Sequence, residues 1–244
     1  MKKLILLSAI LFSVSTTVNA QWWSTTKKVN GNKEVVSQTR NVGNYDRITT
    51  TGMMEVQLVA GKEGKINIEG ESNLIEFIET EVKGDQLKIS VKKGYNLQPS
   101  RNYPIKLTVP FEDLKELSLT GSGKIRNSDI ISSRNFKLQV TGSGNMDLLL
   151  KTDILEGSIT GSGDVKLRGT TNEFNCTVTG SGDFLAYDLK AERAKANVTG
   201  SGDIQLSVIS ELIAKISGSG DITYNGNPEK QDFKTFGSGS VSKR

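Results

Sequence analysis

The sequence predicts an all-β protein of the β-solenoid class, and three observations lead to this prediction. The tripeptide GSG occurs seven times, and successive copies are separated by 18 to 21 residues. On both sides of each GSG, apolar or small residues alternate with polar ones, which is the pattern of half-buried strands. A unit of about 19 residues cannot bury an apolar face alone, whereas stacked units can. We therefore expect coils of ~19 residues that pair in parallel and share one continuous core.

The glycines of the repeat are expected to form sharp corners. Such corners need positive φ, and stacked corners leave little room for side chains. The predicted structural glycines are Gly121, Gly123, Gly142, Gly144, Gly161, Gly163, Gly180, Gly182, Gly200, Gly202, Gly218 and Gly220.

The flanking segments supply the strands of each coil. Upstream of one corner the alternating residues are Phe174, Cys176 and Val178, and downstream of another they are Val165 and Leu167. We expect two short strands per coil, joined by the GSG corner and by a looser turn such as 168–173. A helical repeat is excluded because the apolar period is two and the glycines would break every helix.

The first half of the chain is less regular. The segment 51–58, TGMMEVQL, aligns position by position with TGSGDVKL at 160–167 and is predicted to be a degenerate repeat. Strands are expected at 65–69, 86–91 and 105–109. One helical turn is expected from Asn73, and a hairpin turn at 83–86.

The chain is expected to contain one folded domain after an export signal. Residues 1–20 combine Lys2 and Lys3 with an apolar run and small residues before Gln21, which is typical of a signal peptide. Residues 21–38, with Trp22 and Trp23, are predicted to be a leader or linker. The solenoid domain is predicted over 39–244, with irregular coils at 39–115 and regular GSG coils at 116–244. The expected location is the cell surface or the periplasm of a Gram-negative bacterium.

Charge and residue usage exclude several functions. The chain has 31 basic and 27 acidic residues, and removal of Lys2 and Lys3 with the signal leaves a net charge of 29 − 27 = +2. Basic residues are interleaved with acidic ones, so no nucleic-acid partner is expected. The chain has no histidine, which excludes histidine-based catalysis and zinc ligation. The single cysteine, Cys176, is predicted to be a core residue, with a reactive thiol as the alternative.

Four aspartates follow the glycine corners: Asp164, Asp183, Asp203 and Asp221. Stacked coils would place them about 5 Å apart in a row of like charges. We expect each carboxylate to accept a backbone N–H from its own turn. A cation such as calcium is the weaker alternative. No catalytic residue and no cofactor site is predicted.

The loop 94–104, GYNLQPSRNYP, is the most irregular segment of the chain. It contains Tyr95, Arg101 and Tyr103. Because irregular loops on rigid scaffolds often carry binding, these three residues are a candidate binding loop.

The signal segment, the opening YDRITTTGMMEVQLVAG, the segment VKGDQLKISV and the tandem TGSGD units together resemble a family of exported bacterial proteins. This family is the putative auto-transporter adhesin, head GIN domain family, and the resemblance covers roughly residues 40–240. It implies a right-handed parallel β-helix, similar in shape to pectin-lyase-like solenoids, and a role in cell adhesion.

These observations favour a non-catalytic binding or adhesion module that presents a rigid repeat surface to a glycan or a protein. Two alternatives remain open. One is a structural or regulatory envelope protein of the periplasm that self-associates through the solenoid ends. The other is a polysaccharide-acting enzyme, which would need paired carboxylates or a basic residue in one groove.

Overall fold

The computed structural model describes residues 26–244. The predicted signal peptide and the tryptophans Trp22 and Trp23 lie outside the described residues. The elements of the described chain are β1 (Lys27–Asn30), β2 (Val35–Asn41), β3 (Arg47–Gly52), β4 (Glu55–Ala60), β5 (Lys65–Glu71), α1 (Ser72–Ile75), β6 (Ile78–Lys83), β7 (Gln86–Val91), β8 (Tyr95–Gln98), β9 (Lys106–Phe111), β10 (Glu116–Gly121), β11 (Lys124–Asn127), β12 (Ile131–Gly142), β13 (Asn145–Gly161), β14 (Val165–Gly180), β15 (Phe184–Gly200), β16 (Ile204–Gly218), β17 (Ile222–Asn225), β18 (Lys230–Gly237) and β19 (Val241–Lys243).

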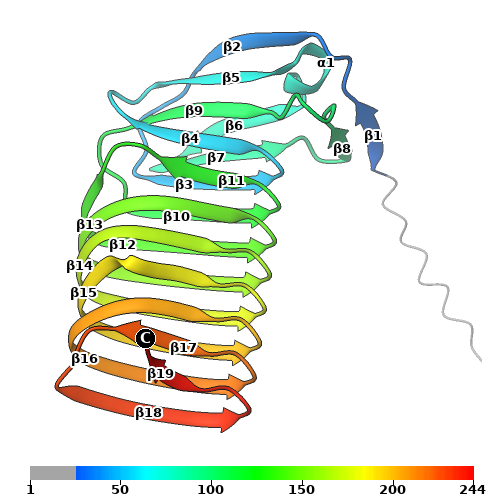
Figure 1. Cartoon of the computed structure of the whole chain (residues 1–244). Coiled ribbons are helices and arrows are strands. Elements are labelled where there is room, and N and C mark those ends of the chain that lie inside the picture. Colours follow the sequence, from blue (N-terminus) through cyan, green and yellow to red (C-terminus); the bar gives the residue numbers. More distant parts are fainter. Residues whose placement is uncertain (1–25) are drawn as a thin grey trace, which may run out of the picture.

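The second half of the chain is a stack of parallel coils (Figure 1). Residues one coil apart lie in register, so that Gly142 pairs with Gly161 and Gly161 pairs with Gly180. The same register continues through Gly200, Gly218 and Gly237. The prediction of an all-β solenoid with stacked GSG corners is therefore confirmed.

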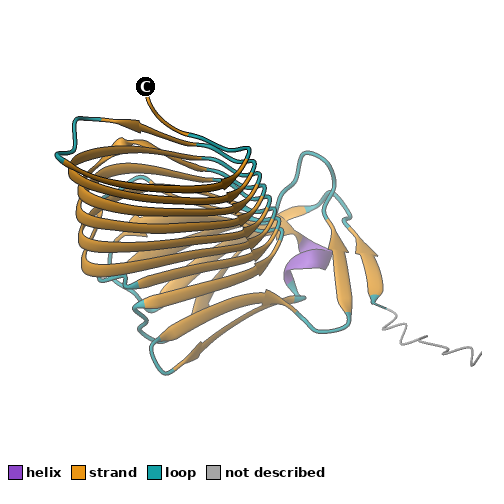
Figure 2. Cartoon of the chain, turned by 90° about the horizontal axis from the view of Figure 1, so that it is seen from below, coloured by secondary structure: helices purple, strands orange, loops and turns teal. Residues whose placement is uncertain are grey.

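In the middle coils the looser turn differs from the expectation of two separate strands, whereas β11 and β12, and likewise β17 and β18, remain separate. β14 continues without a break through 168–173, and its pairing with β13 also continues around the bend. Figure 2, which looks along the stack, shows these long strands curving around the core. Gly169 lies in the bend with φ of +119°, and a Cβ there would lie 1.9 Å from the carbonyl oxygen of Leu150.

The degenerate repeat forms a coil of the same stack. β3 pairs in parallel with β10, which places Thr51–Gly52 beside Thr120–Gly121. β4 pairs in parallel with β11, with Glu55 beside Lys124. The predicted alignment of TGMM with TGSG is thus confirmed in space, although about 70 residues of chain separate the two segments. Met54 takes the place of the second glycine and is fully buried.

Beyond β3 and β4, the stack ends in mixed pairing. β7 and β9 extend it in parallel, whereas β6 runs antiparallel to β7, and β5 runs antiparallel to both β9 and β2. The expected strands at 65–69, 86–91 and 105–109 correspond to β5, β7 and β9. The helical turn is α1, and the hairpin turn at 83–86 joins β6 to β7. The first part of the solenoid domain therefore contains antiparallel strand pairs, one of them the β6–β7 hairpin, in addition to coils.

Part of the predicted leader forms strands. β1 pairs in parallel with β8 in a separate two-stranded sheet, and β2 pairs with β5 along its whole length. Sequence periodicity could not reveal these strands because most of their residues are exposed, so no face carries an apolar pattern.

The core is a continuous stack of inward-facing side chains. One inward row contains Gly157, Cys176, Ala196 and Ala214, which are in register from coil to coil. The small side chains of this row leave room for Phe184. At Gly157, for example, a Cβ would lie 2.8 Å from the Phe184 ring. Phe184 also packs edge-to-face on Phe174, with the ring centroids 5.8 Å apart. Cys176 is buried in the core, as predicted, and burial raises the pKa of its thiol.

Candidate binding groove

The outward residues of β10, β12, β13, β14 and β15 form polar rows across one face of the stack. One row consists of threonines that lie beside one another in successive coils: Thr120, Thr141, Thr160, Thr179 and Thr199. The adjacent row contains Ser158, Thr177 and Asn197. Because parallel strands lie about 4.8 Å apart, this face repeats hydroxyl and amide groups at that spacing.

A groove lies in this face over β12–β15. Its volume is about 490 Å³, and its floor is the backbone around Gly157 and Cys176. The polar side chains that line it are Lys137, Glu156, Ser158, Glu173, Asn175, Thr177, Lys195 and Asn197. We call this set the groove residues. Two lysines and two glutamates balance, so the groove carries little net charge.

The carboxylate of Glu173 is fixed at the edge of the groove. The side-chain amide of Asn175 donates to Oε1 of Glu173 at 2.7 Å, and Arg193 lies 3.9 Å from the other oxygen. These contacts leave the hydroxyl groups of Ser158 and Thr177 facing the groove. The arrangement can offer donors and acceptors to a polar ligand without presenting a strong field of either sign.

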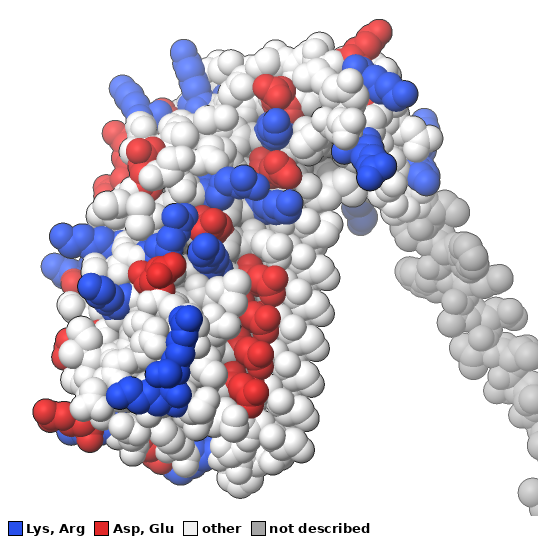
Figure 3. All heavy atoms as spheres, viewed as in Figure 1, with Lys and Arg blue, Asp and Glu red and all other residues white. Residues whose placement is uncertain are grey.

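The four repeat aspartates form a ladder beside the glycine corners, and Figure 3 shows acidic side chains in a column along the stack. The backbone N–H of Asp203 donates to Oδ1 of Asp183 at 2.7 Å, and that of Asp221 donates to Oδ1 of Asp203 at 2.8 Å. The expected partner was therefore wrong, because each carboxylate accepts from the next coil and not from its own turn. At the ends of the ladder, Asn145 and Ser240 take the same places as acceptor and donor.

These charge-assisted bonds offset the repulsion between stacked carboxylates. Each aspartate also links two coils, which a bond within its own turn could not do. Among residues 26–244, no group of three or more His, Cys, Asp or Glu has the geometry to hold a metal ion.

The glycine corners lie against the backbone of the neighbouring coil. At Gly161, φ is +122°, and a Cβ would lie 2.4 Å from the carbonyl oxygen of Gly142. At Gly163 a Cβ would lie 2.1 Å from the carbonyl oxygen of Gly144. The first glycine of the corner is thus needed for both its φ and its lack of side chain, and the second for its lack of side chain.

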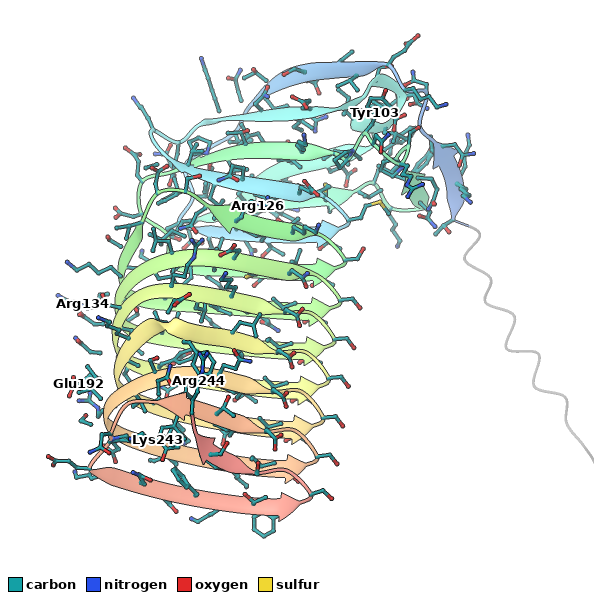
Figure 4. The ribbon with its side chains drawn as sticks, viewed as in Figure 1. Tyr103, Arg126, Arg134, Glu192, Lys243 and Arg244 are labelled. Carbon is teal, nitrogen blue, oxygen red and sulfur yellow. The ribbon has the colours of Figure 1, made fainter. Side chains whose placement is uncertain are left out.

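The structure does not gather the three residues of the predicted binding loop. Tyr95 is half-buried in β8, and its ring packs on Phe77 with the centroids 4.4 Å apart. Arg101 and Tyr103 are exposed, and Tyr103 (Figure 4) lies at the end of the stack where Figure 1 labels α1. The N–H of Tyr103 donates to the carbonyl of Ser100 in a tight turn.

This turn is held by a buried carboxylate that the sequence pattern did not single out. Glu71 is fully buried and accepts the N–H of Ser100 (2.8 Å), the hydroxyl of Ser100 (2.7 Å) and the N–H of Lys33 (2.6 Å). Burial alone would raise the pKa of Glu71, but these hydrogen bonds hold it below its ordinary value. Gly31 makes room for the group, since a Cβ there would lie 1.9 Å from Oε2.

A second cleft of about 540 Å³ lies where the loops of the first half meet the regular coils. Its acidic residues are Asp46, Glu63, Asp85, Glu112 and Asp113. Lys115 pairs with Asp46, and Arg47, next to the cleft, pairs with Asp85 and holds the pKa of that carboxyl below its ordinary value. Arg134, on the side opposite the glycine corners (Figure 4), also lines the cleft. Asp46 and Asp85 are thus used in internal ion pairs, so the charge-balanced groove is the better candidate for binding.

The fold places the chain in the class of β-solenoid proteins, with polar rows on the outer face of a filled core. The chain belongs to the family described as "Putative auto-transporter adhesin, head GIN domain", whose model matches residues 44–228. The suspected membership is thereby confirmed. The family description suggests a non-enzymatic protein located outside the cell or at its surface.

Solved structures of similar proteins have the same fold. A putative adhesin from Bacteroides fragilis is 24% identical and has a TM-score of 0.82, with 88% of this chain and all of that chain covered. A putative lipid binding protein from Parabacteroides distasonis is 28% identical, with a TM-score of 0.74 over 89% of this chain and 100% of that chain. A putative adhesin from Parabacteroides merdae is 24% identical, with a TM-score of 0.70 over 89% and 99%. A search of curated proteins found no match.

The described residues also bear on membrane attachment. No helix within 26–244 is long and apolar enough to cross a membrane.

Proposed function

We propose that the protein is a non-catalytic binding module for adhesion, and that its groove binds a neutral, hydroxyl-rich polymer such as a polysaccharide. The observation that carries this proposal is the groove itself, a polar and charge-balanced hollow in a face of in-register hydroxyl and amide side chains. A repeating surface suits a repeating ligand, because each coil can offer the same contact to the next unit of the chain.

The rigidity of the solenoid supports binding without chemistry. The strands below the groove are paired on both edges, and their inward side chains are buried, so the groove residues are held in place before a ligand arrives. Preorganised contacts reduce the ordering cost of binding. The family description as an adhesin is consistent with this role.

The same proposal includes export by residues 1–20 and exposure at the surface of a Gram-negative cell. A periplasmic envelope protein and a polysaccharide-acting enzyme are the competing functions. Protease treatment of intact cells distinguishes a surface adhesin from a periplasmic protein, because a periplasmic protein is cleaved only after the outer membrane is opened. A time course of sugar release from polysaccharides incubated with the protein tests for the enzyme.

The direct test is binding to a panel of neutral and charged glycans, with Ser158→Arg as the groove variant. Ser158 faces outward, so the arginine fills the groove without entering the core. We expect a loss of affinity of about tenfold or more. Ser242→Arg, on β19 and exposed, is the matched control and should bind as the unchanged protein does.

Two results would count against the proposal. Equal glycan binding by Ser158→Arg and the unchanged protein would remove the groove from the binding site. In the second result, the protein binds no glycan but binds a protein partner, and Ser158→Arg abolishes that binding. The groove would then still be the binding site, but its ligand would be a protein and not a polysaccharide.

A further inference from the structure

Among residues 26–244, β18 is the last strand on its side of the stack, and Figure 1 shows no described strand beyond it. It pairs in parallel with β16, and all eight of its residues are exposed. Its two phenylalanines are among the most exposed large apolar residues, with 37% of Phe233 and 63% of Phe236 accessible. A strand edge of this kind can receive another strand.

The side chains of β18 alternate between the core side and the outer side. Phe233 continues the inward row above Ala214, and its ring lies 5.9 Å from that of Tyr224. Gln231 and Thr235 lie on the same inward side. Asp232 and Lys234 lie on the outer side, where their charged groups are 3.5 Å apart.

We propose that β18 pairs antiparallel with β18 of a second copy. The twofold axis of this dimer is perpendicular to the sheet and passes between the two copies of Phe233. Directly opposite residues in an antiparallel pair point to the same face of the sheet. If inward side chains are to stay inward in both copies, one residue must therefore lie opposite its own copy, since a register shift of one residue would place inward residues opposite outward ones. Centring on Phe233 places Asp232 opposite Lys234 of the partner and Lys234 opposite the partner's Asp232. The contact is therefore self-complementary in charge, as an isologous interface requires.

The same register suits the remaining residues. Phe233 meets its own copy at the end of the core, Gln231 faces Thr235, and Lys230 faces Phe236. Cross-strand pairs of opposite charge and of aromatic side chains are both favourable.

Neighbouring registers are poorer. Centring on Asp232 would oppose two aspartates and two pairs of lysines, and centring on Lys234 would oppose two lysines. Like charges that directly face each other destabilise a sheet. Centring on Gln231 pairs Lys230 with Asp232 but leaves the second half of β18 without a partner.

Such a dimer would join the outer faces of two stacks across the interface. The outward rows that contain Lys195, Asn197 and Thr199 continue through β16 into β18. Two grooves would then lie on one assembly, and a long ligand that reaches both would gain from multivalency. The dimer itself does not depend on the identity of that ligand.

The test is the mass of the full mature chain in sedimentation equilibrium from low to high micromolar concentration. We expect a reversible monomer–dimer equilibrium. Asp232→Lys and Lys234→Asp alone should each weaken dimerisation by about tenfold or more, because each places like charges opposite one another. The double charge swap should restore it to within about threefold. Lys151→Asp, at an exposed position on β13 that β14, β15 and β16 separate from β18, is the control and should leave dimerisation unchanged.

A cysteine scan tests the register separately. Only a residue on the axis faces its own copy, so Phe233→Cys should form an intermolecular disulfide, whereas Gln231→Cys and Thr235→Cys should form it poorly. The single natural cysteine, Cys176, is buried and does not compete. A chain that stays monomeric at all concentrations would overturn the proposal, as would charge variants that dimerise like the unchanged protein. Cross-linking that peaks at 231 or 235 would overturn the register.

Discussion

At the scale of single residues, the glycine corner shows why a repeat can tolerate change at one position and not at the next. Gly161 and Gly163 both lie against the backbone of the preceding coil, whereas Ser162 between them is exposed. The N–H of Ser162 donates to the carbonyl of Gly142, a bond that any residue except proline can make. The constraint thus falls on the glycines and not on the serine side chain.

Gly161→Val is expected to destabilise the protein by more than about 3 kcal/mol, because it adds both backbone strain and a collision with the Gly142 carbonyl. Urea unfolding followed by circular dichroism measures the change. Ser162→Ala is the matched control and should stay within about 0.5 kcal/mol of the unchanged protein. Equal stability of both variants would show that the corner can relax at little cost.

The aspartate ladder gives a second prediction at this scale. Asp203→Ala removes the acceptor for the N–H of Asp221 and should cost about 1–2 kcal/mol. Asp203→Asn keeps an acceptor oxygen and removes one like charge, so its stability should equal or exceed that of the unchanged protein. Asn145 already makes this bond to the N–H of Asp164.

Thermal melts with and without a chelator test whether the aspartate ladder binds a divalent cation. Because the carboxylates are satisfied by backbone N–H groups, we expect the melting temperature to move little when divalent cations are removed. A large rise in melting temperature with added calcium would instead favour the cation alternative.

At the scale of elements, Glu71 joins three segments that are distant in sequence. It lies at the end of β5 and binds Lys33 in the loop between β1 and β2, and Ser100 in the loop after β8. A buried carboxylate that accepts three hydrogen bonds is costly to neutralise or replace. The end of β5 and the two loops are therefore expected to unfold together.

Glu71→Gln should destabilise the protein by about 1–3 kcal/mol at neutral pH, because the amide NH2 must replace one of the two oxygens and so faces either the N–H of Lys33 or that of Ser100. The folded pKa of Glu71 lies below its ordinary value of 4.5, so its stabilising effect is present above that pH and is lost as the pH falls through the folded pKa. The difference between Glu71→Gln and the unchanged protein should shrink in acid. Glu69→Gln, at an exposed position on the same strand, is the matched control because it leaves the three hydrogen bonds of Glu71 in place.

At the scale of the whole molecule, stability depends on how many neighbours each coil has. β14 is paired along its length with both β13 and β15, whereas β18 pairs with β16 as its one strand partner within residues 26–244. In a stacked repeat the end coils open first, because each coil is stabilised mainly by its neighbours.

Hydrogen exchange followed by mass spectrometry should therefore show the fastest exchange among the coils in β18 and β19, and the slowest in β14 and β15. If β18 pairs with a second copy, its exchange should slow as protein concentration rises, whereas that of β1 should not change. Uniform exchange across all coils would mean that the stack opens as one unit.

The coil, its corners and its core could be predicted from the repeat alone. The period of two, the spacing of GSG and the alignment of 51–58 with 160–167 are local or repeated signals, and each corresponds to a feature of the stack. The tertiary structure alone decided which segments pair in the first half, because an antiparallel partner such as β5 for β2 leaves no trace in local periodicity. It also decided that Asp203 binds the next coil, that Glu71 gathers three segments, and that the outer face is hollowed into a groove. The repeat spacing predicts which coils are neighbours, but it does not specify which atoms bind across them or which distant segments meet at Glu71.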